Sequence, residues 1–113
     1  MSTVNEIGIY QLENLVMQRV PFTLFDMTQT HDLPELFKHL NPYYLNFLKQ
    51  QIVKITPTEL LMNEKFQSLP KDSPMVLLCD LGAESQKMAQ ELETKEYQNV
   101  FYVNGGAKSI TVS

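Results

Sequence analysis

The sequence predicts a three-layer α/β fold in which helices flank a mainly parallel central sheet. Three observations lead to this class: strand-like and helix-like segments alternate along the chain, an unbroken apolar run stands at residues 75–78, and several intervening segments begin with helix-capping residues. Strands of a parallel sheet are buried on both faces, and they therefore read as continuous apolar runs. At 113 residues the chain corresponds to a single domain spanning 1–113.

The first segments of the chain alternate as such a fold requires. Residues 7–9 are a short apolar piece. Residues 10–18 place tyrosine, leucine and valine side chains on one helical face, so we expect a helix there. Residues 22–26 are rich in apolar and β-favouring residues, which predicts a buried strand.

Two short helices are predicted next, over residues 32–40 and 41–51. Asp32 has the character of an N-cap, with a glutamate three residues later that completes a capping box. Asn41 precedes a proline at the first helical position, which marks a second helix start. Apolar residues at helical spacing follow both signals, so we expect both helices to pack on the sheet.

The second half repeats the alternation. Residues 52–55 are predicted as a short strand, and the capping box that begins at Thr56 predicts a helix running to about residue 66. A polar loop then leads to the central strand over 75–78. Helical periodicity returns over 84–96, and the last predicted strand covers 99–103.

The central strand ends at the only cysteine in the chain, Cys79. In open α/β sheets, ligands bind just outside the carboxyl ends of the strands, which is where this thiol should lie. A loop between a strand and a helix points backbone N–H groups inward, and the helix N-terminus adds a partial positive charge. Both effects favour an anion, and hence a reactive thiolate, although a lone cysteine after a buried strand is often an inert core residue.

Composition excludes several other classes of function. The net charge is −4 and Arg19 is the only arginine, so nothing favours nucleic acid or an anionic membrane surface as a partner. No apolar run reaches the ~18–20 residues of a membrane span, and no signal peptide is recognisable at the N-terminus. One cysteine excludes an intrachain disulfide and a multi-cysteine zinc site, and we expect a cytoplasmic protein with a reduced thiol.

The string from residue 74 to residue 85 resembles the active-site strand and loop of the rhodanese-like domains, the single-domain sulfurtransferases. The loop of that family runs Cys-x-x-Gly-x-x-Ser, which Cys79, Gly82 and Ser85 match. Three further short motifs stand in the family's order along the chain, at residues 24–27, 97–100 and 103–106. The chain stops within seven residues of the Gly-Gly turn at 105–106, so we expect the family's closing helix to be cut short.

The resemblance implies persulfide chemistry. Cys79 would be the nucleophile that takes a sulfane sulfur from a small donor or a persulfide-carrying protein and passes it to a thiophilic acceptor. The anion-binding loop would comprise Asp80, Leu81, Gly82, Ala83, Glu84 and Ser85. No metal and no organic cofactor is implied. The acidic residues of the loop support an alternative, a rhodanese-like module that has lost catalysis and serves protein binding or regulation.

Other residues yield weaker hypotheses. A cysteine-dependent phosphatase needs an arginine six residues after the cysteine, and Ser85 occupies that position. His31 and His39 are interpreted as non-catalytic, His39 as a surface residue. Aromatic side chains in residues 32–51 are expected to pack on the sheet, with a partner surface or a lid over the cysteine loop as the alternative. The lysines expected nearest the pocket are Lys54, Lys87 and Lys108.

Overall fold

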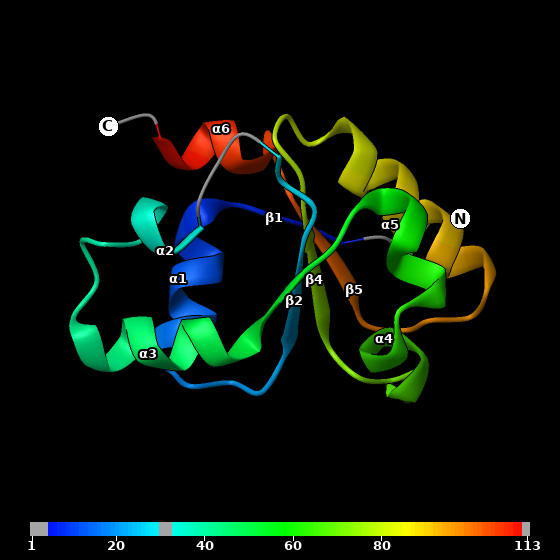
Figure 1. The fold of residues 1–113 in the computed structure, drawn as a ribbon, viewed down its shortest axis with the longest axis horizontal. Helices are drawn as coiled ribbons and strands as arrows, with labels where there is room; N and C mark the ends of the chain where they lie inside the picture. The colour runs from blue at the N-terminus through cyan, green and yellow to red at the C-terminus, as the bar shows by residue number, and fades with distance from the viewer. Residues whose placement is uncertain (1–4, 30–32, 112–113) are drawn as a thin grey trace.

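In a computed structural model, the described residues form a five-stranded parallel sheet with helices on both faces (Figure 1). The structure describes residues 5–29 and 33–111. Every strand pair is parallel, and β4 lies in the middle of the sheet, between β5 and β2. In spatial order the strands are β1 (Asn5–Ile7), β5 (Val100–Val103), β4 (Met75–Leu78), β2 (Thr23–Asp26) and β3 (Ile52–Lys54). This confirms the predicted α/β class and the central position of residues 75–78.

The helices form two layers. One face of the sheet carries α1 (Ile9–Met17), α2 (Leu33–Leu36), α3 (Pro42–Gln51) and α6 (Gly106–Thr111) (Figure 1). The other face carries the 3₁₀-helix η1 (Pro57–Met62), α4 (Glu64–Ser68) and α5 (Ala83–Thr94). Among the described residues, no helix has the length and apolar character needed to cross a membrane.

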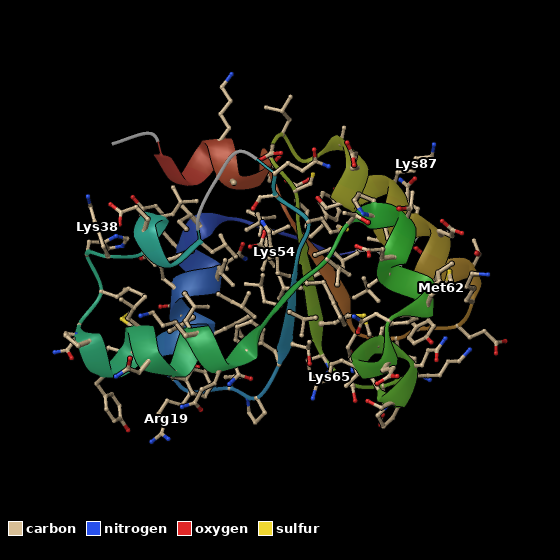
Figure 2. All side chains as sticks on the ribbon, in the orientation of Figure 1. Arg19, Lys38, Lys54, Met62, Lys65 and Lys87 are labelled. Atoms are coloured by element: carbon tan, nitrogen blue, oxygen red, sulfur yellow. The ribbon has the colours of Figure 1, made fainter. Side chains whose placement is uncertain are left out.

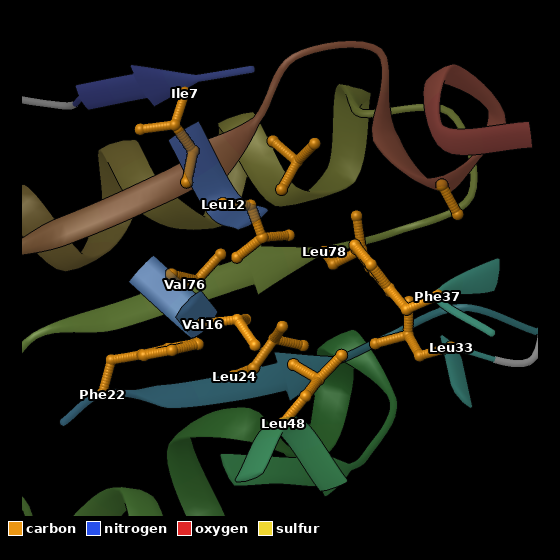
Figure 3. Packing of buried hydrophobic residues seen from close by; sticks show 12 residues of the cluster. Ile7, Leu12, Val16, Phe22, Leu24, Leu33, Phe37, Leu48, Val76 and Leu78 are labelled. Carbon is orange, nitrogen blue, oxygen red and sulfur yellow. The ribbon is translucent and has the colours of Figure 1, made fainter. Parts of the chain in front are cut away.

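Each face of the sheet has its own hydrophobic core, because successive side chains of a strand point to opposite faces. On β4, Val76 and Leu78 pack against the side of α1 and α2, where Leu12 and Phe37 are fully buried (Figure 3). The alternate positions, including Leu77, pack against η1, α4 and α5. Cys79 continues this second set, so its side chain lies on the α5 side of the sheet.

Two predicted helices are shorter or tighter than expected. The helix predicted over 32–40 ends at Leu36, and the amides of Lys38 and Leu40 donate to carbonyls only three residues back. These tight turns bring the chain to Asn41, whose extended backbone precedes a proline and whose side chain caps α3.

The helix predicted from Thr56 to about residue 66 is divided in two. Its capping box is present: Glu59 accepts hydrogen bonds from the backbone N–H and the hydroxyl of Thr56. The segment that follows is the 3₁₀-helix η1, which ends where Asn63 accepts the N–H of Phe66 and starts α4. After β5 the described residues form the short helix α6.

Candidate active site

The candidate site is the loop that joins β4 to α5 at the carboxyl end of the sheet (Figure 1). Cys79 follows the last residue of β4, and α5 begins only four residues later. The chain reverses direction at Gly82, the N-cap of α5, where φ is +97°. L-residues with side chains rarely adopt this conformation, and a Cβ at Gly82 would also meet backbone atoms of Gly105 and Gly106 at 3.0–3.2 Å.

Backbone amides of this loop surround the sulfur of Cys79. The N–H of Gly82 donates to the sulfur at 3.0 Å, and the N–H of Ser85 donates at 3.3 Å. Gly82 and Ser85 lie in the N-cap and first turn of α5, where free N–H groups carry the positive end of the helix dipole. The arrangement therefore stabilises negative charge on sulfur.

The Ser85 hydroxyl lies between two partners. Its oxygen is 3.3 Å from the Cys79 sulfur and 3.1 Å from the carbonyl oxygen of Gly82. With a neutral thiol, the S–H donates to the hydroxyl and the hydroxyl donates to the carbonyl. With a thiolate, the hydroxyl can turn its single proton toward the sulfur, and the Gly82 carbonyl keeps the N–H of Gln86 at 3.0 Å.

The start of α6, which follows β5 after a short turn, is hydrogen-bonded to the cysteine loop. The N–H of Ala107 donates to the carbonyl of Cys79 at 2.8 Å, and the N–H of Lys108 donates to the carbonyl of Asp80 at 3.0 Å. The close approach requires a glycine at position 106, where φ is +66°. A Cβ there would lie 2.5 Å from both the Cys79 carbonyl oxygen and the Gly82 nitrogen.

A cavity of about 220 Å³ opens above the sulfur. Its described lining consists of Gln29, Cys79, Asp80, Leu81, Ala83 and Glu84. The cavity carries two carboxylates, and one of them is fixed: Asp80 accepts the backbone N–H of Gln29 at 3.0 Å. The Leu81 side chain stands out on the rim with 68% of its surface exposed, whereas Cys79 is only 4% exposed.

The structure thus brings the predicted loop residues together around one sulfur. Of the seven, five line the cavity, and the buried residues Gly82 and Ser85 supply hydrogen bonds to the sulfur. We predicted that the amides of all residues from 80 to 85 converge on the sulfur. The hydrogen bonds described come from two of them, because the loop turns sharply at Gly82 and then enters α5.

Sequence reasoning missed a polar cluster at the neighbouring strand end. Asp26, the last residue of β2, is 4% exposed, and its carboxylate accepts the N–H of Thr28 at 2.9 Å and the Thr28 hydroxyl at 2.5 Å. The ammonium group of Lys54, from the end of β3, lies 3.4 Å from the same carboxylate and also donates to the Thr28 carbonyl. The register of Asp26 beside Lys54 could have suggested the pair, had the neighbouring strands been known.

Neither His39 nor any of the three lysines expected near the pocket is among the described residues that line the cavity, although Lys87 lines the hollow beside it. His39 is exposed and contacts the Glu13 carboxylate at 2.8 Å, as a surface residue does, and His31 lies outside the described residues. Phe37 is fully buried, and Tyr44 and Phe47 pack against the same core, whereas Tyr43 is 54% exposed. No described residue of the segment 33–51 lines the cavity.

A buried thiol beneath loop amides, at the end of a central parallel strand, defines a cysteine-centred α/β domain. Comparison with known families assigns this class: the model of the Rhodanese-like domain matches residues 46–112, so the chain belongs to the rhodanese-like family. None of the curated proteins compared with the chain matches it.

Solved structures agree on the fold. A rhodanese-like domain protein from Staphylococcus aureus superposes with a TM-score of 0.65 at 18% identity, covering 94% of this chain and 90% of that one. A rhodanese homologue from Thermus thermophilus gives 0.58 at 17% identity, covering 93% and 99%. An NAD-dependent persulfide reductase from A. fulgidus gives 0.59 at 15% identity, and there the 96% of this chain that matches corresponds to only 16% of a much longer chain.

Proposed function

We propose that this protein is a sulfurtransferase that moves a sulfane sulfur from a donor to a thiophilic acceptor through a persulfide on Cys79. One observation carries the proposal: the Cys79 sulfur accepts N–H groups from Gly82 and Ser85 while it lines an open cavity. A cysteine with a purely structural role needs neither the amides nor the cavity. Family membership supports the same chemistry.

The roles follow from the geometry. Cys79 is the nucleophile, and the amides of Gly82 and Ser85 stabilise its thiolate. With thiosulfate as donor, the thiolate attacks the outer sulfur. The bond between that sulfur and the sulfite group breaks, sulfite leaves with the electron pair, and a Cys79 persulfide anion remains. An acceptor such as cyanide then attacks the outer sulfur, leaves as thiocyanate and regenerates the Cys79 thiolate.

The reaction as proposed needs no metal and no organic cofactor. In each step the nucleophile supplies the electron pair of the new bond and the leaving group takes the pair of the broken bond, so no electrons pass to or from an external group. The lone cysteine fits a cytoplasmic setting, where thiols remain reduced. A cysteine-dependent phosphatase would require a guanidinium group where this chain has Ser85.

The test is a mass measurement. After incubation with a sulfane-sulfur donor and removal of excess reagent, intact mass should increase by one sulfur atom, and cyanide should reverse the gain. Cys79→Ser is the control and should gain nothing. If the unsubstituted chain also gains no sulfur from inorganic or persulfide donors, the alternative is favoured: a rhodanese-like module for protein binding or regulation.

A further inference from the structure

The cavity over Cys79 does not stand alone. A second hollow of about 440 Å³ lies between η1 and α5, and Glu84 lines both. Its apolar lining comes from the half-buried side chains of Pro57, Leu61 and Met88. A sulfur donor that enters the cavity therefore has an adjoining groove in which further parts of it can be bound.

We propose that this groove and the cavity together receive a polypeptide segment that carries a cysteine persulfide flanked by basic and apolar residues. This inference rests on the proposed sulfurtransferase function and names its donor. The sulfane sulfur of the donor enters the cavity. Apolar residues of the donor segment pack on Leu61 and Met88 in the groove, and its basic residues face the carboxylates that line the two hollows.

Charge selects this class of donor. The described lining of the two hollows includes three carboxylates, those of Asp80, Glu84 and Glu91, and one ammonium group, that of Lys87. Their formal sum is −2, and no described residue that lines the cavity itself is basic. Such a surface repels an inorganic dianion such as thiosulfate and attracts lysine and arginine side chains.

The limited access to the Cys79 sulfur favours a donor whose persulfide is at the end of a slender side chain. Cys79 is 4% exposed, whereas Leu81, which also lines the cavity, is 68% exposed. A cysteine side chain on a flexible segment can reach past Leu81, and this leucine can then contact the segment. Met62, the last residue of η1, is 77% exposed, and Figure 2 shows it on the side of the molecule that carries η1 and α5.

The transfer step balances without an external oxidant or reductant. The Cys79 thiolate attacks the outer sulfur of the peptide persulfide, and a new S–S bond forms to Cys79. The S–S bond within the donor breaks, and the donor cysteine leaves as a thiolate with the electron pair. The proton of the donor's outer sulfur stays on the transferred atom or passes to the solvent.

The experiment compares two synthetic peptides of equal length, each with one central cysteine persulfide and two leucines. One has lysines beside these residues and the other has glutamates. The rate at which Cys79 gains one sulfur, followed by intact mass at low ionic strength, should be at least about tenfold higher for the lysine peptide. High salt should reduce this ratio toward one, because exposed charges are screened.

Two charge-reversal variants locate the effect. Glu91 lines the groove but not the cavity, so Glu91→Lys should reduce the preference for the lysine peptide about threefold or more. Glu64→Lys changes the net charge equally but lies in α4, at the opposite end of the sheet from the cysteine loop (Figure 1), and should leave the preference unchanged. Equal rates from the two peptides, or an unchanged preference in Glu91→Lys, would overturn the inference while leaving the sulfurtransferase proposal intact.

Failure of the proposed function gives a different pattern, in which Cys79 gains sulfur from neither peptide nor from thiosulfate. Binding of fluorescently labelled, cysteine-to-serine versions of the two peptides then decides the docking surface separately. Tighter binding of the lysine peptide that Glu91→Lys weakens would uphold the surface, and equal binding of both peptides would overturn it.

Discussion

Two neighbouring strands of the sheet end in buried polar residues that are stabilised in different ways. Asp26 at the end of β2 and Cys79 just beyond β4 are each 4% exposed, and Asp26 pairs in register with the residue before Cys79. Asp26 is balanced by an ammonium group and a threonine, whereas the Cys79 sulfur is surrounded by amides of its own loop. At Asp26 the ammonium group of Lys54 lies 3.4 Å from the carboxylate as a counter-ion. At Cys79 the amide dipoles stabilise an anion, and no described residue that lines the cavity is a cation that a donor would have to displace.

The strongest test of this difference is Cys79→Ser. Serine keeps the size of the side chain and an acceptor for both amides, but it removes the nucleophile. We expect sulfur transfer to fall by at least ~10³-fold, while the free energy of unfolding changes by about 1 kcal/mol or less. Transfer that persists in this variant would show that the sulfur is carried elsewhere.

The second test displaces the loop without touching the sulfur. Gly106→Ala would place a Cβ 2.5 Å from the Cys79 carbonyl oxygen at a φ of +66°, so the two turns must separate. We expect a loss of about 2–4 kcal/mol in urea unfolding, together with slower sulfur loading.

Gly8→Ala is the matched control for this substitution. Gly8 has a negative φ of −90°, and its nearest neighbour would be a flexible glutamine oxygen at 3.7 Å. This variant should lose about 1 kcal/mol or less and load sulfur normally. Equal losses in the two glycine variants would contradict the close approach of the two turns.

A third change gives Cys79 the kind of neighbour that Asp26 already has. Glu84→Arg replaces a carboxylate in the cavity lining with a guanidinium group. We expect kcat/KM for thiosulfate to rise about tenfold, equivalent to about 1.4 kcal/mol, because repulsion of the dianion becomes attraction. Steady-state thiocyanate formation measures it, with Glu64→Arg as the control for net charge. An unchanged kcat/KM would mean that electrostatic repulsion does not limit this site.

The smallest effect is expected from removing the cation at the other strand end. Among the described residues, Lys54→Met leaves the Asp26 carboxylate with the hydrogen bonds from Thr28. Since the Lys54 side chain is 58% exposed and screened by solvent, we expect a loss of only about 1 kcal/mol in urea unfolding. Sulfur loading at Cys79 should be unaffected. A variant that is fully stable but loads sulfur poorly would contradict the division of roles between the two strand ends.

Sequence signals predicted the parts of this molecule whose contacts lie between residues that are close together in the chain. The apolar run at 75–78 and the glycine three residues after Cys79 were enough to predict the central strand and the loop, because strand, turn and helix start are adjacent in the chain. The run of apolar residues at helical spacing after Asp32 did not reveal that α2 ends at Leu36, since the tight turns before Asn41 depend on where α3 must begin.

Contacts between distant segments were not predictable in the same way. Lys54 reaches Asp26 across 28 residues, and the pair depends on which strands are neighbours in the sheet. Similarly, the Gly-Gly turn at 105–106 was recognised as a motif, but not as the support of the cysteine loop. Its role follows from the hydrogen bond between Ala107 and the Cys79 carbonyl, which requires β4 and β5 to be adjacent.

That support links the reactive loop to the order of synthesis. The carbonyls of Cys79 and Asp80 accept hydrogen bonds from the backbone N–H groups of Ala107 and Lys108. The loop therefore cannot take its final shape until residue 108 has emerged from the ribosome. A nascent chain that ends before residue 107 has the Cys79 thiol but lacks the hydrogen bonds that hold its loop in place. In the folded protein, hydrogen exchange at the amides of Ala107 and Lys108 reports each opening of the loop. Both hydrogen bonds must break before the cysteine loop can separate from the start of α6.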